Sequence, residues 1–117
     1  MSYVDGFVAP VRSGVSRDEY RDFAAKAAPI FKDHGATRVV ECWGDDVPHG
    51  RQTDFFRSVQ ATNGETVVFS WIEWPDRETR DAGMKKVMED PRMQPGDPMP
   101  FDGKRLIFGG FATLLDA

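Results

Sequence analysis

The clearest pattern in the chain is the run from Thr66 to Trp74, in which both alternating sets of side chains are mostly apolar. β-Branched and aromatic residues at this density predict a strand, and the Asn63-Gly64 turn before it and Pro75 after it mark its ends. Successive side chains of a strand point to opposite faces, so both faces of this strand need cover. One set is Val67, Phe69, Trp71 and Glu73, and the other is Thr66, Val68, Ser70, Ile72 and Trp74.

Two amphipathic stretches predict helices, and each opens with a capping residue. Ser16 and Glu19 form a capping box for a helix that runs toward His34, with apolar residues at helical spacing along it. Asp76 caps a second helix over 77–89, which Pro91 ends. Runs of β-branched and aromatic residues predict three further strands. These strands cover 3–11, 36–44 and 104–114.

Two segments are less regular. Residues 53–62 admit either a short strand paired through Asn63-Gly64 or one helical turn opened by Thr53 or Asp54. Residues 90–103 are rich in proline, and we expect an ordered excursion without regular structure there.

The order of elements is therefore β-α-β-β-α-β, which is the ferredoxin-like unit of the α+β class. We expect one domain over 1–117, with an antiparallel sheet whose two helices cover one face. The other face carries Val67, Phe69 and Trp71, and so short a chain has no obvious element left to cover it. We therefore expect a homodimer in which two such sheets pack face to face across a two-fold axis.

Composition narrows the classes of partner. The formal net charge of −4 disfavours a general nucleic-acid binder, because neutralising phosphates requires a basic face. Cys42 is the single cysteine, which excludes an intrachain disulfide and is typical of a reducing cytosol. The sequence shows no signal peptide and no apolar run of membrane-spanning length, so we expect a cytoplasmic protein without a membrane partner.

Candidate chemistry concentrates between Glu41 and His49. Glu41, Asp46 and His49 carry atoms that bind metals, but no recognised ligand spacing is present. We therefore interpret Asp45, Asp46 and His49 as a polar loop without a metal, since aspartates favour turns. Cys42 fits a small buried residue better than a nucleophile. The sequence contains no catalytic triad or phosphate loop, so it predicts no cofactor and leaves enzymatic activity undecided.

A ligand cleft is the other candidate site, formed where charged and aromatic residues share the predicted strands. Its candidate residues are Asp5, Phe7, Glu41, Cys42, Phe69, Trp71 and Arg105. Asp5 within a strand is unusual, and we favour a solvent-exposed edge carboxylate over a group directed into a cleft. If these charges point inward they need partners, so an Asp5–Arg105 or Glu41–Arg105 pair is a specific hypothesis.

Four separated segments resemble a bacterial YbaA-like family of unknown function. They are Tyr3–Val8, Glu41–Pro48, Val67–Trp71, and Met99–Arg105 together with Gly109-Gly110-Phe111. The resemblance covers nearly the whole chain and implies the dimeric α/β-barrel superfamily, in which two ferredoxin-like sheets form one barrel. It implies no catalytic residues.

Three functions fit these observations. The first is a homodimer that binds a small apolar molecule in or beside the barrel. The second is a cofactor-independent enzyme similar to the oxygenases and isomerases of that superfamily, which rests on analogy of fold. The third is an interaction or stress-related protein without a ligand, whose barrel interior is filled by its own side chains.

Overall fold

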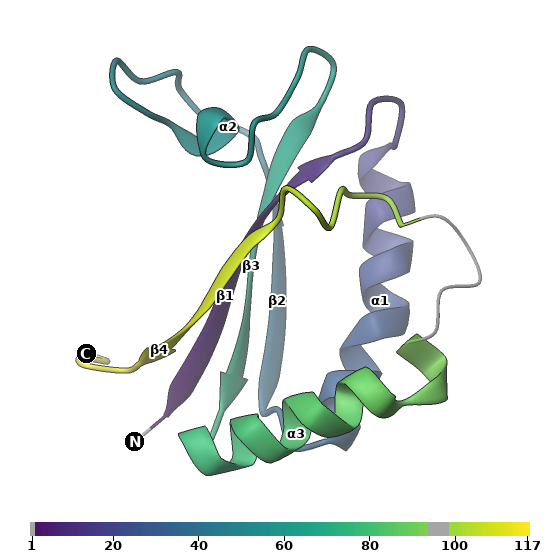
Figure 1. The fold of residues 1–117 in the computed structure, drawn as a ribbon, viewed down its shortest axis with the longest axis vertical. Helices are drawn as coiled ribbons and strands as arrows, with labels where there is room; N and C mark the ends of the chain where they lie inside the picture. The colour runs from purple at the N-terminus through teal and green to yellow at the C-terminus, as the bar shows by residue number, and fades with distance from the viewer. Residues whose placement is uncertain (1, 94–98) are drawn as a thin grey trace.

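The computed structural model describes residues 2–93 and 99–117, and the described chain has the expected βαββαβ order (Figure 1). The strands are β1 (Tyr3–Val11), β2 (Arg38–Trp43), β3 (Thr66–Trp74) and β4 (Ile107–Ala112). The helices are α1 (Arg17–Asp33), α2 (Phe55–Ser58) and α3 (Arg77–Glu89), and a short 3₁₀ helix covers Pro91–Met93.

The sheet is antiparallel, and its strand order is β2-β3-β1-β4. This is the ferredoxin-like topology, so the predicted fold class is confirmed. β1 and β3 occupy the centre and pair along their whole length. α1 and α3 lie on one side of the sheet, and the segment with α2 lies at one end of the other side (Figure 1).

The predicted bounds hold where capping and periodicity are strong. β1, β3 and α3 have the predicted ranges, and α1 carries the predicted capping box of Ser16 and Glu19. β2 and β4 are shorter than expected, so Arg105 precedes β4 instead of lying on it. The ambiguous segment 53–62 contains a helical turn, because the Asp54 carboxylate accepts a hydrogen bond from the Arg57 N–H at 2.7 Å. Part of the predicted excursion over 90–103 lies outside the described residues.

The main core lies between the sheet and the two longer helices. Trp74 and Val87 are fully buried there, and Trp74 packs with Ile72 and Ala36. A second group joins Ala9, Val11 and Val68 of the sheet to Tyr20 and Ala24 of α1. This core covers one face of the sheet, as the alternation along β3 requires.

The opposite face of the sheet keeps large apolar side chains in solvent, and we call it the open face. Its members follow from the strand register and include Val4, Gly6, Val8, Val40, Cys42, Val67, Phe69, Trp71, Ile107, Gly109 and Phe111. The side chain of Phe69 is 46% exposed and that of Phe111 is 62% exposed. The expectation that the chain leaves this entire face bare is wrong at one end. There Val67 is only 3% exposed, because Val59 and Phe56 from the segment around α2 pack over it.

Candidate functional site

A cavity of about 130 Å³ lies between α1 and the sheet, and we call it the α1 cavity. It exists because α1 presents Ala24, Ala27 and Ala28 to this region, and such short side chains leave the space unfilled. Folded interiors rarely contain voids larger than a water molecule, so a space of this size is unusual. The aromatic residues of its lining are Phe7, Tyr20, Phe23, Phe31, Trp71 and Phe101.

Three polar groups converge on this apolar space: Glu41, Tyr20 and Ser70. The Tyr20 hydroxyl donates a hydrogen bond of 3.0 Å to Glu41 Oε2. Ser70 lies directly opposite Glu41 in the register of β2 and β3, so both side chains point toward α1. Tyr20 and Ser70 are buried, whereas Glu41 on the edge strand is exposed. The carboxylate therefore sits where the cavity meets solvent.

The pKa values of Glu41 and Tyr20 determine which of the two side chains donates the hydrogen bond between them. The residue as a whole is exposed, but partial desolvation of its carboxylate beside α1 raises the pKa of Glu41 above its usual value, while the hydroxyl groups of Tyr20 and Ser70 lower it. Burial, the charge of Glu41 and their hydrogen bond together raise the pKa of Tyr20 far above its usual value. Tyr20 thus keeps its proton and donates it, and Glu41 accepts. A carboxylate with a raised pKa inside a cavity is a recognised feature of functional sites.

The residues predicted for the ligand cleft do not form one site, because they line separate spaces on the two sides of the sheet. Phe7, Glu41 and Trp71 line the α1 cavity, and Phe7, Phe69 and Trp71 also line a hollow of about 570 Å³ on the open face. Cys42 is exposed, so the interpretation of a buried thiol is wrong. It lies opposite Phe69 in the register, on the edge strand β2, which has a neighbouring strand on one side only.

Asp5 is a structural residue of the core. Its side chain accepts a hydrogen bond of 2.9 Å from Trp74 Nε1 and bonds of 2.9–3.2 Å from the Arg80 guanidinium. The residue is 3% exposed, so the favoured prediction of a solvent-exposed carboxylate is wrong. The predicted Asp5–Arg105 pair is also wrong, because Arg80 on α3 takes that position.

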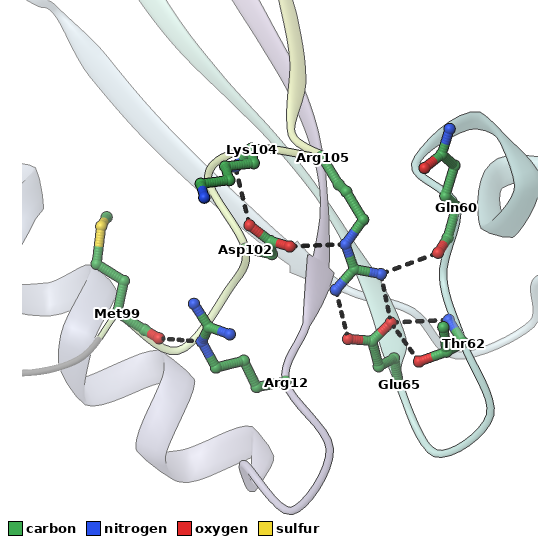
Figure 2. Close-up of polar contacts among 8 residues, drawn as sticks. All are labelled: Arg12, Gln60, Thr62, Glu65, Met99, Asp102, Lys104 and Arg105. Atoms are coloured by element: carbon green, nitrogen blue, oxygen red, sulfur yellow. Dashed lines mark hydrogen bonds and ion pairs between the residues drawn. The ribbon is translucent and has the colours of Figure 1, made fainter.

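Arg105 connects two loops, and its acidic partners are Glu65 and Asp102 (Figure 2), so the predicted Glu41–Arg105 pair is wrong as well. Its guanidinium binds both oxygens of Glu65 at 2.7–2.8 Å, and its Nε binds Asp102 at 2.7 Å. Its Nη1 also donates to the carbonyl of Gln60 at 2.9 Å. The hydrogen bonds from Arg105, with further bonds from Thr62, lower the pKa of Glu65 to about 2. This cluster fastens the chain ahead of β4 to the chain ahead of β3.

The polar loop predicted from Asp45, Asp46 and His49 lies on the surface. The His49 ring stands 4.9 Å from that of Phe56, and its Nδ1 lies 3.6 Å from Asp54 Oδ2. Over 2–93 and 99–117, no group of three or more His, Cys, Asp or Glu side chains is placed to hold a metal ion. Among the same residues, no helix has the length and apolar character needed to cross a membrane.

Sequence reasoning missed Tyr20 and Ser70 as members of a polar group. Tyr20 is one of the residues at helical spacing that predict α1, and a tyrosine hydroxyl on the buried side of a helix needs a partner. Ser70 is a small polar residue between the apolar Val68 and Ile72 of the same set of β3, which is the signal that could have identified it.

The hollow on the open face follows from two glycines. Gly6 of β1 and Gly109 of β4 stand opposite each other in the register, and the Phe111 ring lies over both. A Cβ on Gly6 or Gly109 would lie 3.7 Å or 3.5 Å from the nearest atom of that ring. The glycines thus let the Phe111 ring lie close to the sheet, and the hollow lies between this ring and the rings of Phe69 and Trp71.

Comparisons with known proteins agree with the resemblance seen in the sequence. A family described as "Protein of unknown function (DUF1428)" matches residues 2–103. The chain is 57% identical over 117 residues to "Uncharacterized protein YbaA" of Escherichia coli (strain K12), with 99% of both chains covered. A protein of the same name from Shigella flexneri matches to the same extent.

Proposed function

The chain belongs to the DUF1428 family of proteins of unknown function, and we propose that it is a homodimer that binds one small apolar molecule per chain in the α1 cavity. The observation that carries this proposal is the cavity itself. Its volume of about 130 Å³ is close to the roughly 150 Å³ of an engineered apolar cavity in another protein that stays dry and binds benzene. A ligand with a single six-membered ring therefore fits the space.

Binding inside the α1 cavity is supported by the lining. Aromatic rings, alanine methyl groups and aliphatic side chains line it, which favours an apolar ligand through burial from water. The polar group at Glu41 is small and localised, as in ligand sites where a few polar atoms set the orientation of a mostly apolar molecule.

Dimerisation is supported by the open face. Monomeric proteins rarely expose contiguous apolar patches, and such patches commonly mark interaction sites. The exposed rings of Phe69 and Phe111 lie on a face whose central members carry no charge. The charges at its margin, Arg38 and Glu73, pair with each other at 3.5 Å. A second copy related by a two-fold axis presents the same rings and the same hollow. The exposed rings of one copy can therefore pack into the hollow of the other.

The ligand proposal is tested by titrating the protein with toluene while following methyl signals by NMR. We expect saturable shifts at the methyl groups of Ala24 and Ala27, which line the cavity. Ala27→Leu adds carbon atoms to the cavity and should abolish those shifts. Ala25→Leu makes the same change on the exposed side of α1 and should leave them intact. Absence of saturable shifts in the unmodified protein would remove this part of the proposal.

A second candidate is an isomerase-like enzyme, favoured by the raised pKa of Glu41 beside the cavity. Its carboxylate would take a proton from carbon next to a carbonyl group and return it, which needs no cofactor. Incubation with cyclohexanone in D₂O tests this, with NMR reporting exchange of the protons next to the carbonyl. Exchange no faster than with the Glu41→Gln variant would end this candidate.

A further inference from the structure

The acceptor capacity of Glu41 points to a chemical class of ligand. A carboxylate offers about four acceptor positions, and Tyr20 occupies one of them on Oε2, while Ser70 lies opposite Glu41 in the strand register. Among residues 2–93 and 99–117, the hydrogen bonds to Glu41 leave acceptor positions on this carboxylate, which lines the cavity. The Tyr20 hydroxyl has one proton and already gives it to Glu41. This polar group therefore accepts hydrogen bonds from a ligand more readily than it donates them.

We propose that the α1 cavity selects a neutral one-ring molecule that carries a hydrogen-bond donor, such as a phenol, with the donor bound to Glu41. This inference rests on the proposed ligand binding and specifies its substrate class. The ring lies among the apolar side chains of α1 and the sheet, and the donor meets the carboxylate at the edge strand β2. A ligand that is itself a carboxylate is excluded, because it would place a second negative charge beside Glu41.

Phenol and toluene separate this inference from simple apolar binding, since they have nearly the same shape. Phenol loses hydrogen bonds to water when it enters an apolar cavity, so a cavity without an acceptor prefers toluene. A hydrogen bond to a charged acceptor is stronger than one to a neutral acceptor. With the Glu41 carboxylate as acceptor, the cavity should therefore bind phenol more tightly than toluene. We expect phenol to bind at least tenfold more tightly than toluene, and benzoate not to bind, in titrations followed at the Ala27 methyl group.

Glu41→Leu supplies the decisive variant. Glu41 is on an edge strand and exposed, so the substitution opens no space in the core, but it removes the acceptor of the Tyr20 hydroxyl. We expect this variant still to bind toluene, and to bind phenol less tightly than toluene. Glu89→Leu makes the same change on an exposed residue of α3 and should keep the preference for phenol. If Glu41→Leu does not fold, Glu41→Gln replaces it, and its weaker neutral acceptor should lower phenol affinity several-fold while toluene affinity stays the same.

The outcomes distinguish the two proposals. Toluene binding equal to or tighter than phenol binding in the unmodified protein overturns the assignment of ligand class and leaves apolar binding in place. A preference for phenol that persists in Glu41→Leu also overturns it, because the donor must then bind elsewhere. If neither compound binds, the proposed ligand function fails together with this inference.

Discussion

At the scale of single residues, Gly83 sets how closely α3 approaches the sheet. A Cβ at this position would lie 2.5 Å from the carbonyl oxygen of His34 and 2.5 Å from Cζ3 of Trp74. Neither group has room to move, because His34 caps α1 and the Trp74 ring holds Asp5 through its Nε1. The absence of a side chain at Gly83 therefore permits the contact between helix and sheet.

Gly83→Ala should lower the free energy of unfolding by about 1–3 kcal/mol, since overpacking forces neighbouring groups to shift. This loss should appear although alanine favours a helix by about 1 kcal/mol over glycine. Urea denaturation measures the difference. Gly103→Ala is the control, because a Cβ there meets no atom within 4 Å. A Gly83→Ala protein as stable as the control would show that the helix position is set by other contacts.

Single residues also show where sequence reasoning stopped. Asp5 could be recognised as unusual in a strand, but its partner Arg80 could not be found. Arg80 is one of several charged residues on α3, and only the angle at which α3 crosses the sheet brings it to Asp5. The same holds for Glu41 and Tyr20, whose contact depends on how α1 lies on β2.

At the scale of elements, the Arg105 cluster joins segments that no strand pairing connects. It ties Asp102 before β4 to Glu65 before β3 and to Gln60 after α2 (Figure 2). The loop that leads into the edge strand β4 is thereby fixed to the centre of the sheet.

The low pKa of Glu65 gives this cluster a defined pH dependence. The pKa is lowered from its usual value of 4.5 to about 2 in the folded protein, so the ionised form is favoured by folding. The resulting stabilisation is fully present above pH 4.5 and is lost as pH falls toward 2. Glu65→Gln should therefore be less stable than the unmodified protein at pH 7, and the difference should shrink across this window.

Urea denaturation at a series of pH values checks this prediction. Glu89→Gln makes the same change of charge on an exposed residue of α3 and serves as the control. A stability difference for Glu65→Gln that stays constant between pH 7 and pH 2 would mean that ionisation of Glu65 does not stabilise the fold.

The elements differ in how far the sequence determines them. α1 and α3 were predicted closely because Ser16 and Asp76 cap them and Pro91 follows α3. α2 spans only Phe55–Ser58, which is too short to show a helical period. Its packing over Val67 was missed for the same reason, since it depends on how the loops around α2 fold back on the sheet.

At the scale of the whole molecule, the two faces of the sheet have different surroundings. The alternation along β3 already required cover on both faces, and α1 and α3 supply it on one (Figure 1). On the open face the segment around α2 covers only the end near Val67. Exposed leucines at 114 and 115 add further apolar surface near the end of β4. The proposed homodimer accounts for this surface by placing a second sheet against the first.

Molecular mass in solution, measured by light scattering during size-exclusion chromatography, tests this account most directly. Twice the 13.2 kDa of one chain is expected for the unmodified protein. Phe69→Glu places a charge on the open face and should give 13.2 kDa. Met88→Glu, on an exposed apolar residue of α3, should remain dimeric. An unmodified protein of 13.2 kDa, or a dimer that Phe69→Glu leaves intact, would contradict the account.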